Sequence, residues 1–255
     1  MAPGLPGAIL PSRRPPMSVA ETIAGADPAI LLLCDHASNA VPDGVDLGVA
    51  PDLMTRHITV DIGAGPLTRT LAAALGARAI LATVSRLVID LNREPDHPGI
   101  VPLTSDGHAI PGNIDADIAA RIARFHVTYH QAIAAEIARQ RPALIVAVHS
   151  FTPRLEDGGG DRPWVIGVLY NRDTRAARPA IDRLRARGHV TGDNEPYSGR
   201  LLNATINRHA EGNGIAYLSL ELRNDQIGDA AGVARWADEL APLLAELASG
   251  LRAAP

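Results

Sequence analysis

The sequence has no lysine and only one cysteine, Cys34. Without lysine the chain offers no residue for a Schiff base and no lysine general base. A single cysteine excludes an internal disulfide and any metal site built from several thiolates, and it fits a reducing compartment. We therefore expect a cytoplasmic protein whose chemistry rests on other side chains.

Aromatic residues make up only 3% of the chain, and the formal net charge is -4. The protein thus has neither a platform for stacking bases nor a cationic surface for phosphate backbones, which argues against a nucleic-acid partner. No apolar run approaches the roughly 20 residues that cross a bilayer, so no membrane partner is expected. A small-molecule ligand remains the expected partner, while the sequence leaves the oligomeric state open.

With 255 residues and 46% hydrophobic content, the chain is long enough for one large α/β domain. We expect that domain to cover residues 21–255. Residues 1–20 are rich in proline and glycine and predict a disordered or loosely packed tail, not a signal peptide.

Two continuous apolar runs, at residues 29–34 and 143–148, are typical of strands that are covered on both faces. Together with helical spacing elsewhere, they predict a mostly parallel or mixed central sheet with helices on both faces. Further strands are predicted at 80–84, 164–170 and 215–220, and helices at 66–75, 114–137, 174–187 and 233–251.

Residues 85–94 combine an apolar run with two arginines, an aspartate and an asparagine. We interpret the first part as a strand, in which alternation places Arg86, Asp90 and Asn92 on one side, with Arg93 at the following turn. Guanidinium and carboxamide groups at the end of a sheet indicate a site for an anionic ligand. The alternative is an internal ion pair between Arg86 and Asp90.

Polar residues follow the other predicted strands at the same end. His36 and Asn39 follow the first, His149 the next core strand, and Glu221 and Arg223 the last. The carboxyl ends of parallel strands share one edge, so two imidazoles and a carboxylate should meet there. Imidazole is the commonest protein ligand of zinc, which indicates a metal site. Hydrogen-bonded loop histidines are the alternative.

Three other interpretations concern residues near this edge. Cys34 beside His36 suggests a thiol hydrolase, but a cysteine inside an apolar run is expected to be an inert buried thiol. Asp61 stands at a predicted helix entrance, where we favour a helix N-cap over a ligand. The remaining histidines, among them His126, His130 and His209, are expected to be solvated.

Six segments in this order resemble the N-formylglutamate amidohydrolase family and, more distantly, the zinc carboxypeptidases and the aspartoacylase group. They are CDHASNAVP from residue 34, HITVDIGA from 57, SRLVIDLNR from 85, AVHSFTP from 147, NEPYSG from 194 and LSLELRND from 218. The resemblance implies a zinc-carboxypeptidase-like hydrolase fold and the removal of a formyl or other small acyl group from an N-acyl amino acid. N-formyl-L-glutamate, cleaved to formate and glutamate, is the best single substrate.

The resemblance also implies roles for individual residues. One Zn²⁺ per chain would be held by His36 and His149, Glu221 would act as the general base, and Arg86 would stabilise the oxyanion. Substrate carboxylates would be held by Asn92 and Arg93, with Arg200 or Arg223 for a second carboxylate.

One position departs from the pattern of the wider group, which has a glutamate as the second metal ligand where this chain has Asn39. Either Asn39 ligates through its carbonyl oxygen, or Asp35 or Asp61 supplies the carboxylate, or metal is held weakly. The departure motivates an alternative function: a non-catalytic binder of N-acyl amino acids with a degenerate metal site. A carboxypeptidase or deacylase of other specificity is a second alternative.

Overall fold

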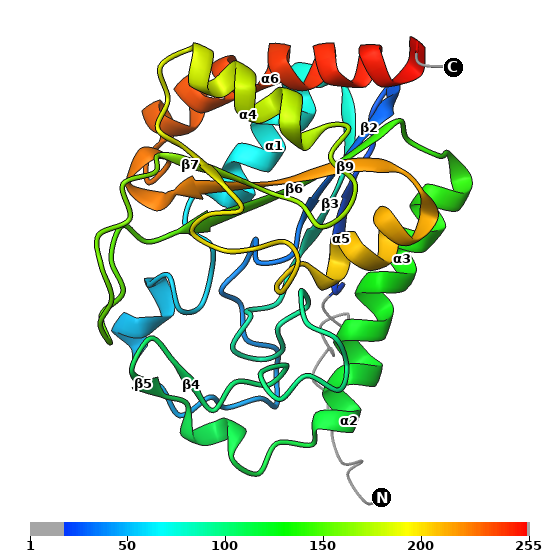
Figure 1. The fold of residues 1–255 in the computed structure, drawn as a ribbon. Helices are drawn as coiled ribbons and strands as arrows, with labels where there is room; N and C mark the ends of the chain where they lie inside the picture. The colour runs from blue at the N-terminus through cyan, green and yellow to red at the C-terminus, as the bar shows by residue number, and fades with distance from the viewer. Residues whose placement is uncertain (1–17, 254–255) are drawn as a thin grey trace, which may run out of the picture.

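A seven-stranded sheet runs through the middle of the molecule (Figure 1). The computed structural model describes residues 18–253, so most of the predicted tail at 1–20 lies outside the described residues. The strand order is β1-β3-β2-β6-β9-β7-β8. The strands are β1 (Ala20–Ile23), β2 (Asp27–Cys34), β3 (Ala77–Ala82), β6 (Leu144–Phe151), β7 (Ile166–Leu169), β8 (Thr191–Asp193) and β9 (Ala216–Arg223).

The four inner strands β3, β2, β6 and β9 are parallel to one another. The flanking strands β1 and β7 pair antiparallel with β3 and β9, and β8 runs parallel to β7. In β2 the residues from Ala29 to Cys34 are all buried, as are those from Leu144 to His149 in β6. Such continuous burial is expected of parallel strands that are covered on both faces. The predicted mixed, mostly parallel α/β fold is thereby confirmed.

Helices cover both faces of the sheet (Figure 1). On one face, α1 (Ala64–Leu75) and α4 (Ala177–Ala186) pack against the long α6 (Ala230–Ala253). On the other face, α3 (Val127–Arg139) contacts β1, β3 and the short α5 (Ala204–His209). Among the described helices, none is long and apolar enough to cross a membrane.

The remaining elements are short and lie mainly in the loops. They are the hairpin β4 (Thr104–Ser105) and β5 (His108–Ala109), the 3₁₀ turns η1 (Pro51–Thr55), η2 (Pro111–Asn113), η4 (Glu211–Asn213) and η5 (Asn224–Gln226), the one-turn helix α2 (Ile118–Arg121) and the π-helical turn η3 (Ile122–His126). The helix predicted from residue 114 therefore starts at Ile118, where the Asp117 carboxylate accepts from the amide of Ala120.

Residues 85–94 form successive turns and not the predicted strand. Their apolar side chains Leu87, Val88, Ile89 and Leu91 are nevertheless fully buried. An apolar run indicates that a segment is buried, but the burial does not require a neighbouring strand: here side chains of α2, η3 and α3 contact the backbone of the segment. The turns free the polar side chains to face a common cavity.

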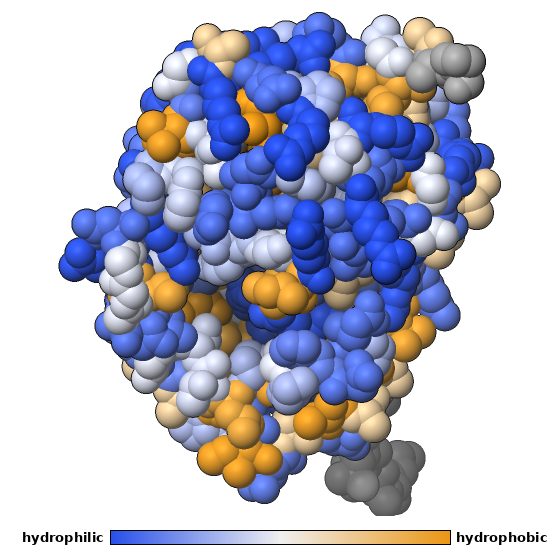
Figure 2. Space-filling model, in the orientation of Figure 1, coloured by the Kyte–Doolittle hydropathy of each residue, from blue (hydrophilic) through white to orange (hydrophobic). Residues whose placement is uncertain are grey.

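The connection pattern creates a switch point between β2 and β6. From β2 the chain passes through α1 to β3 on one side, and from β3 it crosses back to β6 on the other side. Open α/β sheets bind ligands in the crevice at such a point, outside the carboxyl ends of the strands. In Figure 2 the surface is mostly hydrophilic and is hollowed between the sheet and the loops below it.

Candidate active site

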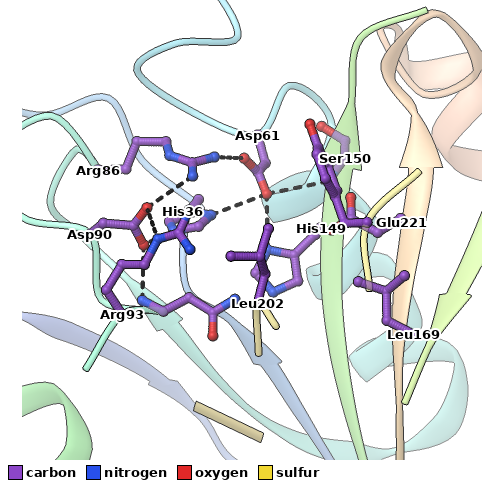
Figure 3. Close-up of a pocket in the computed structure, with 12 residues that line it drawn as sticks. His36, Asp61, Arg86, Asp90, Arg93, His149, Ser150, Leu169, Leu202 and Glu221 are labelled. Carbon is purple, nitrogen blue, oxygen red and sulfur yellow. Dashed lines mark hydrogen bonds and ion pairs between the residues drawn. The ribbon is translucent and has the colours of Figure 1, made fainter. Parts of the chain in front are cut away.

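A cavity of about 140 Å³ lies at the carboxyl ends of β2, β6 and β9. Most of its wall is polar, and Figure 3 shows the side chains that converge on it. The lining residues are His36, Asp61, Arg86, Asp90, Asn92, Arg93, His149, Ser150, Leu169, Tyr197, Leu202 and Glu221. The strand ends predicted to converge thus do meet, at the switch point of the sheet.

The buried carboxylate of Asp61 stands between the two imidazoles. Its Oδ2 lies 3.3 Å from Nδ1 of His36 and 3.0 Å from Nδ1 of His149. Arg86 donates to the other oxygen at 3.0 Å. Burial disfavours charge on Asp61, but the His36 imidazole, the His149 hydrogen bond and the Arg86 charge outweigh it and lower the pKa of Asp61. The carboxylate is therefore held in its anionic form.

The backbone around Asp61 explains this position. Its amide donates to the carbonyl of His36, and its own carbonyl accepts from Ala64 at the start of α1. The N-cap of α1 is Gly63, at φ 80°, and no side chain caps the helix. A Cβ on Gly63 would approach the carbonyl oxygen of Ile227 to 2.1 Å, so the turn requires glycine. The interpretation of Asp61 as an N-cap is therefore wrong.

Each imidazole has a second carboxylate on its far side. Nε2 of His36 lies 2.8 Å from Oδ1 of Asp90, and Nε2 of His149 lies 3.4 Å from Oδ2 of Asp35. Asp35 is itself held by the hydroxyl of Tyr129 at 2.8 Å. With a metal ion bound at Nδ1, a carboxylate at Nε2 would favour the tautomer that carries its proton there, which would free the Nδ1 lone pairs for the ion.

These three residues fit a divalent metal ion. Each of His36, Asp61 and His149 offers one donor atom, and all three donors lie within 4.8 Å of one another. Donors of a tetrahedral zinc site, with bonds of about 2.0–2.1 Å, lie about 3.3 Å apart. The Nδ1 to Oδ2 distances of 3.3 and 3.0 Å match that spacing. The set also combines two imidazoles with one carboxylate, as catalytic zinc sites do.

Asn39 is not part of this group. Its side chain is exposed, and its amide nitrogen donates to the carbonyl of Met54 at 2.7 Å. Of the three residues considered for the second ligand, Asp61 lies between the histidines, whereas Asp35 contacts only the far side of His149. Although this chain has Asn39 where the wider group has a glutamate ligand, the carboxylate of Asp61 still completes the set of possible metal donors.

A second group of donors joins His57, Asp106 and Glu156, which lie on three different loops. Nε2 of His57 lies 2.7 Å from Asp106, and the Asp106 carboxylate also accepts from the backbone amide of Glu156. The Glu156 carboxylate pairs with Arg56 and His108. These hydrogen bonds and ion pairs connect the three loops to one another.

Arg86 lies between two carboxylates (Figure 3). It donates to Asp61 at 3.0 Å and to Asp90 at 2.9 Å, so the predicted ion pair with Asp90 is present. Burial opposes the charge on Arg86, but Asp90 and Asp61 outweigh it and raise the pKa of the guanidinium. Arg86 also lines the cavity, and a guanidinium carries five N–H donors, so donors remain for a ligand.

Glu221 has no hydrogen-bond partner for its buried Oε2. It lies within β9, where it pairs in register with His149 of β6. Burial raises the pKa of Glu221 to about 7. A carboxylate with a free oxygen, poised to change protonation near neutral pH beside a metal-type donor set, is suited to general base and acid chemistry.

Asn92 and Arg93 present hydrogen-bond donors to the cavity. The side-chain oxygen of Asn92 accepts from the amide of Thr205 at 3.0 Å, which leaves the NH₂ group as its free end. Arg93 lies 3.7 Å from Asp90, without a closer carboxylate partner among the described residues. Both groups suit an anionic ligand.

The other two predicted arginines do not line the cavity. Arg200 is exposed, and Arg223 bonds to Asp225 at 2.9 Å and to the carbonyl of Arg162 at 3.3 Å. Arg223 follows Glu221 by two residues in β9, but its guanidinium turns to these surface partners.

Tyr197 belongs to the cavity, although the sequence interpretation gave it no role. Its hydroxyl accepts from Arg162 at 3.1 Å, and burial raises its pKa, which keeps the phenol protonated. The NEPYSG segment was the only signal for it. Leu169 and Leu202 supply the apolar part of the wall and had no distinguishing pattern.

Cys34 and three histidines are all buried. Burial raises the pKa of the Cys34 thiol, which argues against the thiol hydrolase. His126, His130 and His209 were expected to be solvated, and this expectation is wrong. They face the interior between α3 and α5, where helical spacing alone did not distinguish them from the surface positions.

Known proteins resemble this chain in sequence and in fold. The family model of N-formylglutamate amidohydrolase matches residues 29–228. A gene product of Agrobacterium tumefaciens, Atu2144, has 29% identity and a TM-score of 0.87, over 92% of this chain and 97% of that one.

A second solved structure, N-formylglutamate amidohydrolase from Ralstonia eutropha JMP134, shares the fold with a TM-score of 0.68 and 19% identity, over 92% of this chain and 99% of that one. No protein with a curated description matches the chain. Since the family model covers most of the chain, the protein belongs to the N-formylglutamate amidohydrolase family and is a hydrolase of amide bonds.

Proposed function

We propose that this protein is a metal-dependent amidohydrolase that removes a formyl or other small acyl group from an N-acyl amino acid. The best single substrate is N-formyl-L-glutamate, which gives formate and glutamate. The observation that carries the proposal is the unpaired carboxylate of Glu221 beside the donor set of His36, Asp61 and His149.

The three donors would hold one Zn²⁺ per chain. Bound there, the ion supplies Lewis acidity, which favours both ionisation of water and polarisation of the acyl carbonyl. Asp90 keeps His36 oriented by a hydrogen bond, the Asp35 carboxylate faces His149 at 3.4 Å, and Arg86 holds the far oxygen of Asp61. The protein therefore supplies a buried set of donor atoms whose orientation is held by neighbouring charged side chains.

Glu221 would act on the proton of the attacking water. As the water oxygen bonds to the formyl carbon, Glu221 takes the proton, and as the C–N bond breaks it returns that proton to the leaving amine. Its pKa, raised by burial to about 7, suits both halves of this cycle. Spare N–H groups of Arg86 would stabilise the charge that develops on the carbonyl oxygen.

Asn92 and Arg93 would hold the α-carboxylate of the amino-acid portion through the free NH₂ group and the guanidinium. Arg200 and Arg223 lie outside the cavity wall, so contact with a side-chain carboxylate would require the substrate to extend beyond it. The small cavity favours a small acyl group such as formyl.

The alternative of a non-catalytic binder has less support. A degenerate site would have no need for a buried carboxylate without a partner, because leaving such a group unpaired costs free energy. A carboxypeptidase or deacylase of other specificity differs only in substrate. The buried thiol of Cys34 supports the cytoplasm as the compartment.

The test is metal analysis of protein purified without chelator, combined with hydrolysis assays. We expect about one zinc per chain, with cleavage of N-formyl-L-glutamate lost on chelation and restored by zinc. A panel of N-acyl amino acids then ranks the acyl groups and side chains. Protein that binds no metal and cleaves no member of the panel would refute the proposal.

A further inference from the structure

Three buried histidines lie behind the segment that carries Asn92 and Arg93. His126 and His130 stand one turn apart, with ring centroids 4.1 Å apart, and His209 at the end of α5 stacks on His130 at 5.1 Å. None of them lines the cavity, and the proposed reaction leaves them without a role.

The cluster binds two backbone carbonyls of that segment. Nε2 of His126 lies 3.0 Å from the carbonyl oxygen of Arg93, and Nε2 of His130 lies 3.0 Å from that of Leu91. A carbonyl only accepts, so both nitrogens carry protons. In a neutral His130 ring Nδ1 then accepts, and Nε2 of His209 donates to it at 2.8 Å. With both rings neutral, these partners define the proton positions along the hydrogen bonds from His209 to His130 to the Leu91 carbonyl.

Thr205 holds the same segment from the start of α5. Its hydroxyl donates to the Leu91 carbonyl at 3.3 Å and its amide to the side-chain oxygen of Asn92 at 3.0 Å. The two carbonyls on either side of Asn92 are thus anchored, and so is its side chain. What remains free is the NH₂ group of Asn92 and the guanidinium of Arg93, both at the cavity.

The helix that carries His126 and His130 is irregular at its start. Residues Ile122–His126 form a π-helical turn in which the amide of Val127 bonds to the carbonyl of Ile122. Such turns are uncommon and occur frequently at functional sites. Burial lowers the pKa of His130 to about 3 and that of His209 to about 4, which keeps both rings neutral, as the hydrogen bonds require.

We propose that His126 and His130, with His209 behind His130, are positioning residues that hold Asn92 and Arg93 in place for the carboxylate of the substrate. This rests on the proposed function in one respect: it takes Asn92 and Arg93 as the carboxylate-binding pair. The histidines touch no reacting atom, so their removal should weaken the binding of the carboxylate and spare the chemical step.

The experiment compares His126→Ala and His126→Gln on N-formyl-L-glutamate and on the same compound with its α-carboxylate converted to a carboxamide. Removing the donor leaves a buried carbonyl unpaired, and we expect KM for the carboxylate substrate to rise about 5- to 100-fold with kcat within about 3-fold. The carboxamide substrate should show no such rise. Glutamine places an N–H near the position of Nε2 and should restore most of the affinity.

The control is His189→Ala, which removes another half-buried histidine, one that pairs with Glu239 and packs on Trp236. It should lower the melting temperature without changing KM. A purely structural role for His126 would likewise lower stability or kcat with KM unchanged, or would raise KM equally for both substrates. Either result would overturn the inference.

Calorimetric binding of L-glutamate separates this inference from the proposed function. If wild-type protein binds glutamate but cleaves no formyl substrate, the proposed function fails, while weaker binding by His126→Ala still supports the positioning role. If His126→Ala does not fold, the same comparison is made with His209→Ala, which removes the hydrogen bond to His130. Unchanged glutamate binding in the variant that folds, or no glutamate binding by wild type, would overturn the inference.

Discussion

Nε2 of His36 lies 2.8 Å from Oδ1 of Asp90, on the opposite side of the ring from Asp61. Asp90 also accepts from Arg86 at 2.9 Å and from the backbone amide of Asn92 at 3.0 Å. One carboxylate therefore joins the proposed metal ligand, the arginine and the substrate-binding segment.

Replacing Asp90 by Asn should weaken metal binding without abolishing it. The variant keeps an oxygen for His36 but loses the charge that holds Arg86 and favours the correct tautomer. Such changes typically lower metal affinity about 10- to 100-fold. Competition for zinc with a chromophoric chelator measures the effect, and the exposed Asp43→Asn serves as the control. Equal affinities in the two variants would contradict the role given to Asp90.

Asp61 and Asn39 should differ sharply in the same assay. Asp61→Ala removes one of the three donors, and we expect its loss of zinc affinity to exceed the factor of about 100 typical of residues that only contact a ligand. Asn39→Ala removes a bond to the Met54 carbonyl on the surface and should retain about one zinc per chain. If Asn39→Ala lost zinc and Asp61→Ala kept it, the assignment of the donors would be reversed.

Glu221→Gln should lower kcat about 10²- to 10⁴-fold, because glutamine cannot take the proton of water. Zinc content and glutamate binding should not change. The substitution also replaces a buried, unpaired carboxylate by a neutral group of the same shape, so the melting temperature should stay constant or rise. Steady-state kinetics with metal analysis and a thermal melt check all three points. A folded, zinc-loaded variant with full activity would remove Glu221 from the mechanism.

Arg93→Ala should affect substrate binding more than Arg200→Ala does. Arg93 lines the cavity, whereas Arg200 is exposed beyond it. A charge-assisted hydrogen bond is worth about 1.5–3 kcal/mol, so KM should rise about 10- to 150-fold for Arg93→Ala. The comparison of KM for N-formyl-L-glutamate in the two variants decides the matter. A larger effect of Arg200→Ala would place the carboxylate site outside the cavity.

Stability should fall in mild acid through His130 and His209. Burial lowers their pKa values to about 3 and 4, below an ordinary value of 6.5. The unfolded chain therefore binds protons below pH 6.5 that the folded protein refuses until pH 3–4, and stability is lost as pH falls through that interval. At pH 5 the expected loss is about 1–2 kcal/mol per histidine.

Urea unfolding at pH 7.5 and pH 5 measures this loss, and the difference between wild type and the double variant His130→Gln/His209→Gln isolates it from other groups. The double variant should lose less stability between the two pH values than wild type. An identical pH dependence in wild type and double variant would show that the buried pair does not carry the effect.

The central strands were predictable because a continuous apolar run of five or six residues is typical of a strand covered on both faces. The predicted strand at 143–148 corresponds to β6, and His149, placed just after it, lies inside the strand, as Glu221 lies inside β9. Their register across the sheet is decided by the neighbouring strand, which periodicity along one segment does not contain. The short strands β1 and β8 were missed because β1 has no buried residue and β8 has only three residues, two of them buried.

The histidines of the candidate site follow from their place after core strands, but the carboxylate between them did not. Asp61 stands before a helix, where a local cap is the ordinary role of aspartate. Only long-range contacts, to His36 across 25 residues and to His149 across 88, distinguish it. The same holds for the buried histidines His126 of η3 and His130 of α3, whose partners Arg93 and Leu91 lie in a different part of the chain.

The outer strands of the sheet have a consequence for self-association. Unpaired strand edges invite pairing with another chain, and the long parallel strands β3 and β9 would be attractive templates. Instead the sheet terminates in β1, with four residues, and β8, with three. Edge strands this short expose few unpaired backbone N–H and C=O groups. The sheet therefore offers little edge for pairing with a second molecule, which disfavours edge-to-edge aggregation.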